Sequence, residues 1–290
     1  MFHKILFVGA LLSVTVTALP AANTPQSTVT LSTTQIVEKN VTARGGLPAW
    51  RAVKAMSLEG KMGVGGNERT TSTEPLPSKK NAQLPTDPRP KDEVQLPFVM
   101  EMQRPRKLRF EIQFKGQTAV QVFDGEKGWK LRPYLNRREV EPYTEQELKL
   151  ASAKTELDGP LIDYAAKGTQ VQLEGADQVD GHDTYKLKLT MKNNHSIHVW
   201  IDAKTFLETK IEGAPRTLDG VEHPVEVYYT DYRQVKGLQI PFTLETKVLP
   251  APTKVEPKRK EILPPSEKIL VDHVTINTRL DSSVFEKPRS

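Results

Sequence analysis

The fold class follows from one stretch of sequence, Lys107–Lys115, which reads KLRFEIQFK. Charged and polar residues alternate strictly here with apolar ones, which are Leu108, Phe110, Ile112 and Phe114. Successive side chains of a β-strand point to opposite faces, so this pattern predicts a strand with one dry and one wet face. Such two-sided strands are typical of antiparallel sheets.

The same period of two recurs along the rest of the chain. Residues 185–191 and 197–201 alternate in the same way around the turn Asn193-Asn194, and predict a hairpin. Further strands are expected at 205–211, 225–232, 240–248 and 269–277. Connections of two or three residues are too short for crossover helices, so neighbouring strands must be antiparallel. We therefore expect a mainly β protein with one large antiparallel meander of about twelve strands.

Short helices interrupt the strand pattern in two places. Ser32 or Thr33 can cap a first helix that ends at Gly45, and a second turn carries Trp50 as an anchor on the body of the fold. The segment 144–168 predicts two more short amphipathic helices, the first opened by a capping box of Thr144 and Glu147. Their apolar sides need a partner, and the dry face of the sheet is the available one.

The N-terminus indicates export. The uncharged apolar run Ile5–Val16 is too short to span a bilayer and follows a basic residue, as in a secretory signal peptide. We expect a signal peptide over residues 1–22, cleaved somewhere between Ala18 and Ala22. The remainder, 23–290, is expected to be a single domain. We expect it to be exported and soluble, without stable membrane insertion, because no second long apolar segment follows.

Two segments within this domain are rich in proline and lysine and poor in apolar residues. They cover residues 63–97 and 249–265, and we expect both to be mobile inserts between strands.

Composition excludes several kinds of function. The chain has no cysteine, hence no disulfide, no thiolate metal site and no cysteine nucleophile. The net charge is +5, with both signs interspersed, so no nucleic-acid partner is expected. His195 and His198 are three apart in or beside a strand, which sends them to opposite faces and argues against a metal site. No nucleophile elbow, zinc-protease motif or phosphate loop occurs. We expect no enzyme, catalytic residue or cofactor.

A resemblance to a known family begins at Arg104-Pro105 and continues through Asp124-Gly125 and Trp129. This stretch, with short pieces such as Gly159-Pro160-Leu161-Ile162-Asp163-Tyr164, resembles the LolA/LolB superfamily of outer-membrane lipoprotein-sorting proteins, over roughly Thr34–Phe285. The absence of cysteine excludes the lipid-anchored type and leaves the periplasmic LolA-like branch. The resemblance implies an incomplete, half-open barrel whose apolar concave face is covered by short helices and holds acyl chains.

The resemblance also implies a role for one arginine. Arg104 matches the family arginine that binds lid backbone, the lid latch, and a planar guanidinium suits several carbonyl acceptors. The alternative reading is a strand-edge arginine on a solvated face.

The expected function is therefore a periplasmic carrier of lipoprotein or lipid acyl chains in envelope lipoprotein sorting, with membrane-bound donor and acceptor proteins as partners. The expected lining is Leu108, Phe110, Ile112, Phe114, Leu187, Leu189, Val199 and Ile201, and the expected lid residues are Leu148, Leu161, Ile162 and Tyr164. The alternative function is an envelope sensor or protein-interaction module without cargo. The same pattern also fits a filled core.

Overall fold

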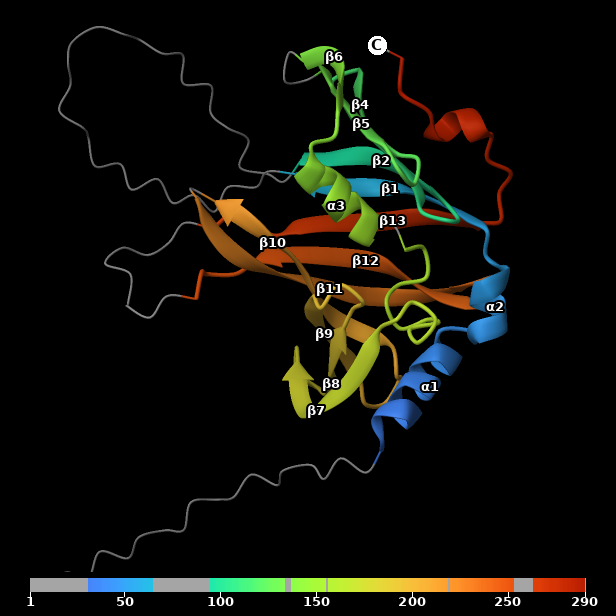
Figure 1. The fold of residues 1–290 in the computed structure, drawn as a ribbon, viewed down its shortest axis with the longest axis vertical. Coiled ribbons are helices and arrows are strands. Elements are labelled where there is room, and N and C mark those ends of the chain that lie inside the picture. The colour runs from blue at the N-terminus through green and yellow to red at the C-terminus, as the bar shows by residue number, and fades with distance from the viewer. Residues whose placement is uncertain are drawn as a thin grey trace, which may run out of the picture.

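The structure, a computed structural model, describes residues 31–64, 94–133, 137–154, 156–218, 220–252 and 263–289. In these ranges thirteen β-strands form one antiparallel sheet that does not close into a barrel (Figure 1). The predicted mainly β, antiparallel, half-open architecture is confirmed. The predicted signal peptide lies outside the described residues.

The sheet consists of two meanders. The first contains β1 (Ala55–Val64), β2 (Val94–Gln103), β3 (Lys107–Phe114), β4 (Gln117–Phe123), β5 (Gly128–Arg132) and β6 (Arg137–Pro142). The second contains β7 (Gln170–Val179), β8 (His182–Thr190), β9 (Ser196–Asp202), β10 (Glu208–Leu218), β11 (Val221–Val235), β12 (Leu238–Val248) and β13 (Glu267–Ile276).

The two meanders join through the first and last strands. The spatial order is β6-β5-β4-β3-β2-β1-β13-β12-β11-β10-β9-β8-β7, so β6 and β7 are consecutive in the chain but occupy opposite edges. At the junction Met56 pairs with Ile276, and a bulge follows at Gly60. A Cβ on Gly60 would lie 2.0 Å from the carbonyl oxygen of Leu270. Glycine is therefore required where the two halves meet.

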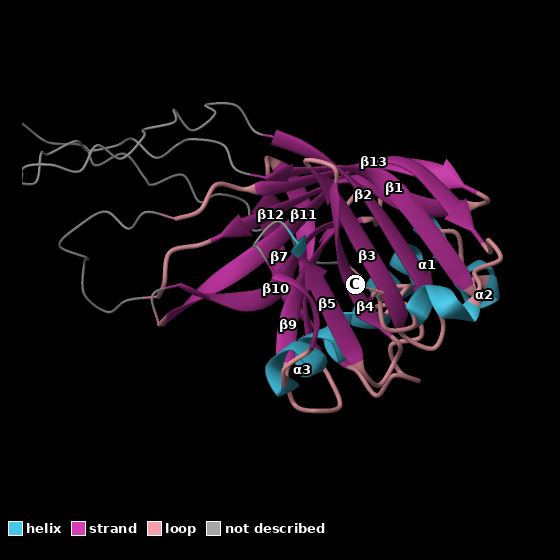
Figure 2. Cartoon of the chain, turned by 90° about the horizontal axis from the view of Figure 1, so that it is seen from above, coloured by secondary structure: helices cyan, strands magenta, loops and turns pink. Residues whose placement is uncertain are grey.

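Helices and turns lie against the concave side of the sheet (Figure 2). They comprise α1 (Thr33–Ala43), α2 (Leu47–Ala52) and α3 (Glu145–Lys154). Ser32 caps α1, and Trp50 is 1% exposed, as the anchor prediction requires. The predicted capping box is present at α3: the Thr144 hydroxyl accepts from the Glu147 amide at 3.2 Å, and the Glu147 carboxylate accepts from the Thr144 amide at 2.8 Å.

The second helix predicted within 144–168 was wrong. Residues 156–169, which we call the crossing segment, form consecutive turns instead. Gly159 and Asp163 both adopt positive φ, 76° and 53°, which interrupts any helix at these points.

The predicted boundaries of the two inserts were also too wide. Residues 63–64 belong to β1, and residues 94–97 belong to β2. Pro97 pairs with β1 alone, because the pairing between β2 and β3 starts at Phe98. A proline is tolerated where a strand has a single neighbour. The parts at 65–93 and 253–262 lie outside the described residues.

Two apolar clusters occupy the concave side. The central cluster is formed mainly by β1, β2, β12, β13 and α2; its buried members include Trp50, Met56, Phe98, Phe242 and Val271. The β8–β9 cluster contains Ile36 and Val37 of α1 with Leu187, Leu189, Val199 and Ile201. The crossing segment joins them, since Leu161 belongs to the β8–β9 cluster and Ile162 to the central one.

A third cluster lies on the convex side. Val120 and Val122 of β4 pack there against Phe285 in a C-terminal 3-10 helix, Ser282–Phe285. Arg109 of β3 donates to the carbonyl of Val284 at 3.1 Å. The wet face predicted for β3 is thus partly covered by the C-terminal segment.

Candidate functional site

Half of the predicted lining is tightly packed. Leu187, Leu189, Val199 and Ile201 are each 0% exposed. They contact Ile36 and Val37 of α1 and Leu161 of the crossing segment in the β8–β9 cluster. A ligand could touch these four residues only if α1 moved away, so in this structure they form filled core.

The other half of the predicted lining is different. Leu108, Phe110, Ile112 and Phe114 of β3 are all only half-buried. Phe110 lies opposite Met100 of β2, and its ring centroid is 5.8 Å from that of Phe98. The cross-strand neighbours are therefore apolar as well, and together they form a partly uncovered surface.

We call this surface the open patch and define it by six half-buried residues that pack on the central cluster. They are Leu58, Met62, Met100, Met102, Phe110 and Ile112. All come from β1, β2 and β3, and register places them on one face: Leu58 pairs with Met100, and Met100 with Phe110. The open patch is thus a continuous apolar area on three adjacent strands.

The open patch is rich in methionine. Of the six methionines in the chain, Met62, Met100 and Met102 lie in it, and Met56, buried in the central cluster, pairs with Met102. Methionine has an unbranched, flexible and polarizable side chain that adapts to irregular partners. Sequence reasoning missed these residues: Leu96, Phe98, Met100 and Met102 recur with a period of two, but Pro97 and the apolar Val99 stand between them and weaken the alternation. The proline-rich character of 63–97 had concealed the start of β2.

An ion pair links helix α3 to the sheet. The Lys130 ammonium of β5 lies 2.5 Å from the Glu147 carboxylate, and Lys130 itself is buried. Burial alone would raise the pKa of Glu147, but hydrogen bonds from Lys130 and Thr144 outweigh it and lower this pKa. The predicted lid residue Leu148 is half-buried, while Leu150 is 38% exposed. The helix therefore covers the sheet loosely.

The other predicted lid residues anchor the cover. Leu161 and Ile162 are 0% exposed and bind the crossing segment to both apolar clusters. Tyr164 is half-buried against the β8–β9 cluster. All three side chains hold the crossing segment against the apolar clusters, and the fully buried Leu161 and Ile162 cannot face a ligand.

Arg104, in the β2–β3 turn, makes the kind of contacts expected of a latch. Its Nε donates to the carbonyl of Val53 at 2.8 Å, and its Nη2 to that of Trp50 at 3.3 Å, both at the end of α2. The same Nη2 lies 2.6 Å from an oxygen of Asp158. One guanidinium thus ties the sheet to α2 and to the crossing segment.

Asp158 is the centre of this arrangement. Its side chain is 3% exposed, and its second oxygen accepts from the Lys167 ammonium at 2.7 Å. Burial would raise the pKa of Asp158, but hydrogen bonds and positive charge from Lys167 and Arg104 bring it below its usual value. The carboxylate is therefore ionised and fully paired. Sequence reasoning did not single it out, because no local pattern marks a contact between residues 54 positions apart.

A second buried ion pair lies nearby and was also not predicted. Arg44, at the end of α1, donates to Glu208 of β10 at 3.1 Å and to the carbonyl of Asp158 at 3.0 Å. The Tyr232 hydroxyl donates to the Glu208 carbonyl at 2.9 Å, and burial raises the pKa of that tyrosine. Breaking a buried pair by removing one partner is costly, so this network fixes α1 and the crossing segment to the sheet.

A cavity of about 200 Å³ opens beside the latch. It is lined by the turn 103–106 and by Glu156, Leu157, Asp158 and Lys167. This volume is below the ~300–1,000 Å³ typical of pockets for drug-sized ligands. It adjoins the central cluster, since Leu157 belongs to both.

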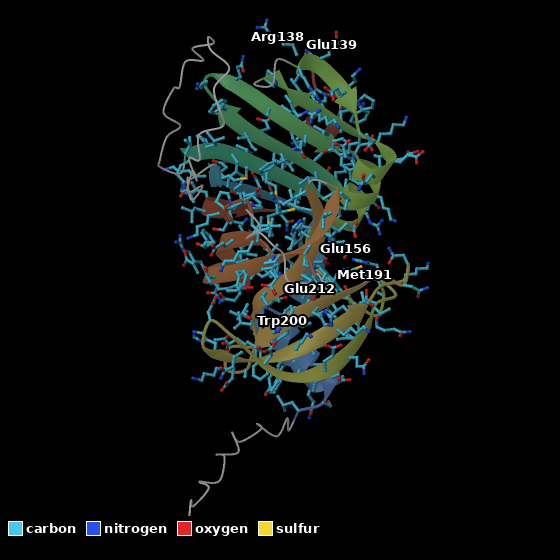
Figure 3. The ribbon with its side chains drawn as sticks, turned by 90° about the vertical axis from the view of Figure 1, so that its left-hand side faces the viewer. Arg138, Glu139, Glu156, Met191, Trp200 and Glu212 are labelled. Carbon is cyan, nitrogen blue, oxygen red and sulfur yellow. The ribbon has the colours of Figure 1, made fainter. Side chains whose placement is uncertain are left out.

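The convex side of the second meander is polar and charged. Trp200 of β9 lies beneath the Lys210 ammonium, 3.9 Å from the ring centroid, and donates to Asp177 at 2.8 Å. His198 lies between carboxylates of Glu174 and Glu212, at 3.2 and 2.8 Å. Figure 3 shows Trp200 and Glu212 on the half of the molecule opposite Arg138 and Glu139 of β6. Among the residues that the structure describes, no group of three or more acidic or histidine side chains is placed to hold a metal ion.

Comparison with known proteins rests on structure, because no family model and no curated protein sequence matches the chain. A crystal structure of a LolA superfamily protein from Nitrosomonas europaea matches 89% of this chain and 98% of its own, with a TM-score of 0.53 and 12% identity. The chain has a LolA-like fold. A DUF1329 family protein from Desulfovibrio piger matches 88% and 97% of the two chains, with a TM-score of 0.50 and 11% identity.

In this LolA-like sheet the concave side is divided. The half at β8 and β9 is filled by α1, while the half at β1, β2 and β3 presents the open patch. Such a division leaves one apolar area available to a ligand or partner. No helix in the described ranges is long and apolar enough to cross a membrane.

Proposed function

We propose that the protein is a periplasmic carrier of acyl chains, from lipoproteins or lipids, and that the open patch is the surface that binds them. The observation that carries the proposal is the open patch itself: six adjacent apolar side chains, three of them methionine, are left half-buried on the concave side. Burying a sixteen-carbon chain at ~0.8 kcal/mol per methylene could contribute about 10 kcal/mol before ordering costs. Apolar contact alone is thus strong enough for tight binding.

The cover offers a route for loading and release. Arg104 and Lys167 hold the crossing segment through the buried carboxylate of Asp158, and Lys130 with Glu147 holds α3. A competing partner that breaks these charged contacts would loosen the cover, and full opening would also have to withdraw Leu161 and Ile162 from the apolar clusters. We propose membrane-bound donor and acceptor proteins as these partners, within envelope lipoprotein sorting. The proposal assigns no catalytic residue and no cofactor.

A second function is favoured by the filled half of the concave side. Because Leu187, Leu189, Val199 and Ile201 are completely buried, the fold could instead serve as an envelope sensor or interaction module without cargo. Native mass spectrometry of the protein purified from envelope extracts separates the two. Retained mass that carries acyl chains supports the carrier; a captured protein partner with no such mass supports the sensor.

The carrier proposal is tested by placing a charge in the open patch. Phe110→Asp puts an unpaired carboxylate among apolar side chains and should abolish uptake of a fluorescent fatty-acid probe. Gln113→Asp is the matched control, because Gln113 lies on the same strand, is exposed and faces the other side. Circular dichroism shows whether each variant is folded. Unchanged uptake by a folded Phe110→Asp protein would refute the assignment.

A further inference from the structure

We propose that the cavity beside the latch binds the anionic headgroup of the acyl ligand, so that the carrier selects anionic amphiphiles over neutral or zwitterionic ones of equal chain length. This inference rests on the proposed carrier function and adds the chemistry of the ligand's polar end.

The charges around the cavity do not cancel. Arg104, Arg106 and Lys167 contribute three positive charges, and Glu156 and Asp158 contribute two negative ones. Both oxygens of Asp158 are taken, one by Arg104 at 2.6 Å and the other by Lys167 at 2.7 Å. Lys167 also contacts Glu156 at 2.7 Å. Two cations and two carboxylates therefore pair among themselves.

Arg106 is the cation left over. It is exposed, it lines the cavity, and its guanidinium has no hydrogen-bond or ion-pair partner among the residues described. A planar guanidinium presents five donors in a fork that matches a carboxylate or phosphate. The cavity thus carries one uncompensated positive charge of the type suited to a single anionic group.

The cavity is placed to receive the head of a chain that lies on the open patch. Leu157 lines the cavity and packs on the central cluster alongside Met100 and Met102. Gln103, in the cavity wall, directly follows Met102. At about 200 Å³ the cavity has room for a headgroup, while the chain must lie elsewhere. The cavity and the open patch are therefore contiguous, so one ligand can place its polar end in the cavity and its apolar tail on the open patch.

The backbone at Arg106 supplies a clean variant. Its φ is 127°, a conformation that glycine adopts readily and other residues rarely. Arg106→Gly therefore removes the charge while suiting the backbone, and the protein should remain folded. Arg106→Lys keeps the charge. Lys115→Gly is the matched control: it also removes one positive charge at a residue with positive φ, 49°, but at the opposite end of β3.

The experiment uses native mass spectrometry of the full exported chain incubated with equimolar pairs of lipids. One pair is dioleoyl phosphatidylglycerol and dioleoyl phosphatidylcholine; the other is oleic acid and oleyl alcohol. We expect the wild type and the Lys115→Gly and Arg106→Lys variants to prefer the anionic member of at least one pair by about tenfold, the effect of one charge-assisted hydrogen bond. Arg106→Gly should lose the preference while still binding. The pair that shows the preference identifies the source, a phospholipid phosphate or a free carboxylate.

Two failures can be told apart. Binding of all four lipids without preference, or a preference that survives Arg106→Gly, overturns the headgroup site and leaves the carrier intact. Absence of any bound lipid in the wild type overturns the carrier proposal, and the headgroup site with it.

Discussion

Replacing Asp158 by asparagine should loosen the cover far more than its single-atom change suggests. The carboxylate makes two charge-assisted hydrogen bonds, 2.6 Å to Arg104 and 2.7 Å to Lys167, and is 3% exposed. Hydrogen bonds to charged groups contribute ~1.5–3 kcal/mol each. Arg104 is 37% exposed and Lys167 keeps Glu156, so we discount the sum to about 2–3 kcal/mol. The asparagine amide would also direct a donor at one of the two cations.

This loss should be visible in two measurements. A chain of this size loses ~2–4 °C of Tm per kcal/mol, so thermal unfolding should shift by about 5–10 °C. Hydrogen exchange should accelerate in the crossing segment before it does so in the central strands.

The control is Asp163→Asn in the same segment. Asp163 pairs with Arg51, whose side chain is 61% exposed, and asparagine tolerates its φ of 53°. The expected change is within ~0.5 kcal/mol. A Tm for Asp158→Asn within about 1 °C of the wild type, together with unchanged exchange, would refute the latch reasoning.

Three further predictions follow from contacts described above. The pKa of Asp158 is lowered in the folded protein, so its carboxylate stabilises the fold fully at pH values above its unfolded pKa of ~3.9. This stabilisation is lost as pH falls through the folded pKa. The difference in Tm between the wild type and Asp158→Asn should therefore close below about pH 4. Glu147→Gln removes the negative charge beside Lys130 but keeps an oxygen that accepts from it, so hydrogen exchange in α3 should rise with a global loss under ~1 kcal/mol. Unchanged exchange would count against this ion pair as the tether of α3. Phe285 is 1% exposed, so Phe285→Ala leaves a cavity and should lower the free energy of unfolding, measured in urea, by about 3 kcal/mol. A loss below ~1 kcal/mol would contradict this packing role.

Local patterns predicted the strands and caps well. The alternation in Lys107–Phe114 and the asparagine turn before Ser196 correspond to β3 and to the β8–β9 hairpin. The Thr144–Glu147 capping box is formed as predicted. These features depend on neighbours in the chain, and periodicity and cap chemistry carry that information directly.

Non-local choices could not be predicted in the same way. Alternation gave Leu187 and Phe110 the same inward orientation, yet α1 covers the first completely and leaves the second half-buried. Which helix docks on which strands is decided by long-range contacts such as Arg44 with Glu208. The pairing of Asp158 with Arg104 is of the same kind. The sequence pattern therefore indicated a dry face but not which part of it stays accessible.

The pairing of β1 with β13 determines the point at which the central sheet can be completed during folding. Met56 pairs with Ile276, so the centre of the sheet is completed by β13, which follows the other twelve described strands in the chain. Until then β1 and β12 each present an unpaired apolar edge, which invites aggregation. Native pairings of such long sequence separation also slow folding. A chain that lacks β13 therefore holds two incomplete half-sheets, each with an exposed edge strand.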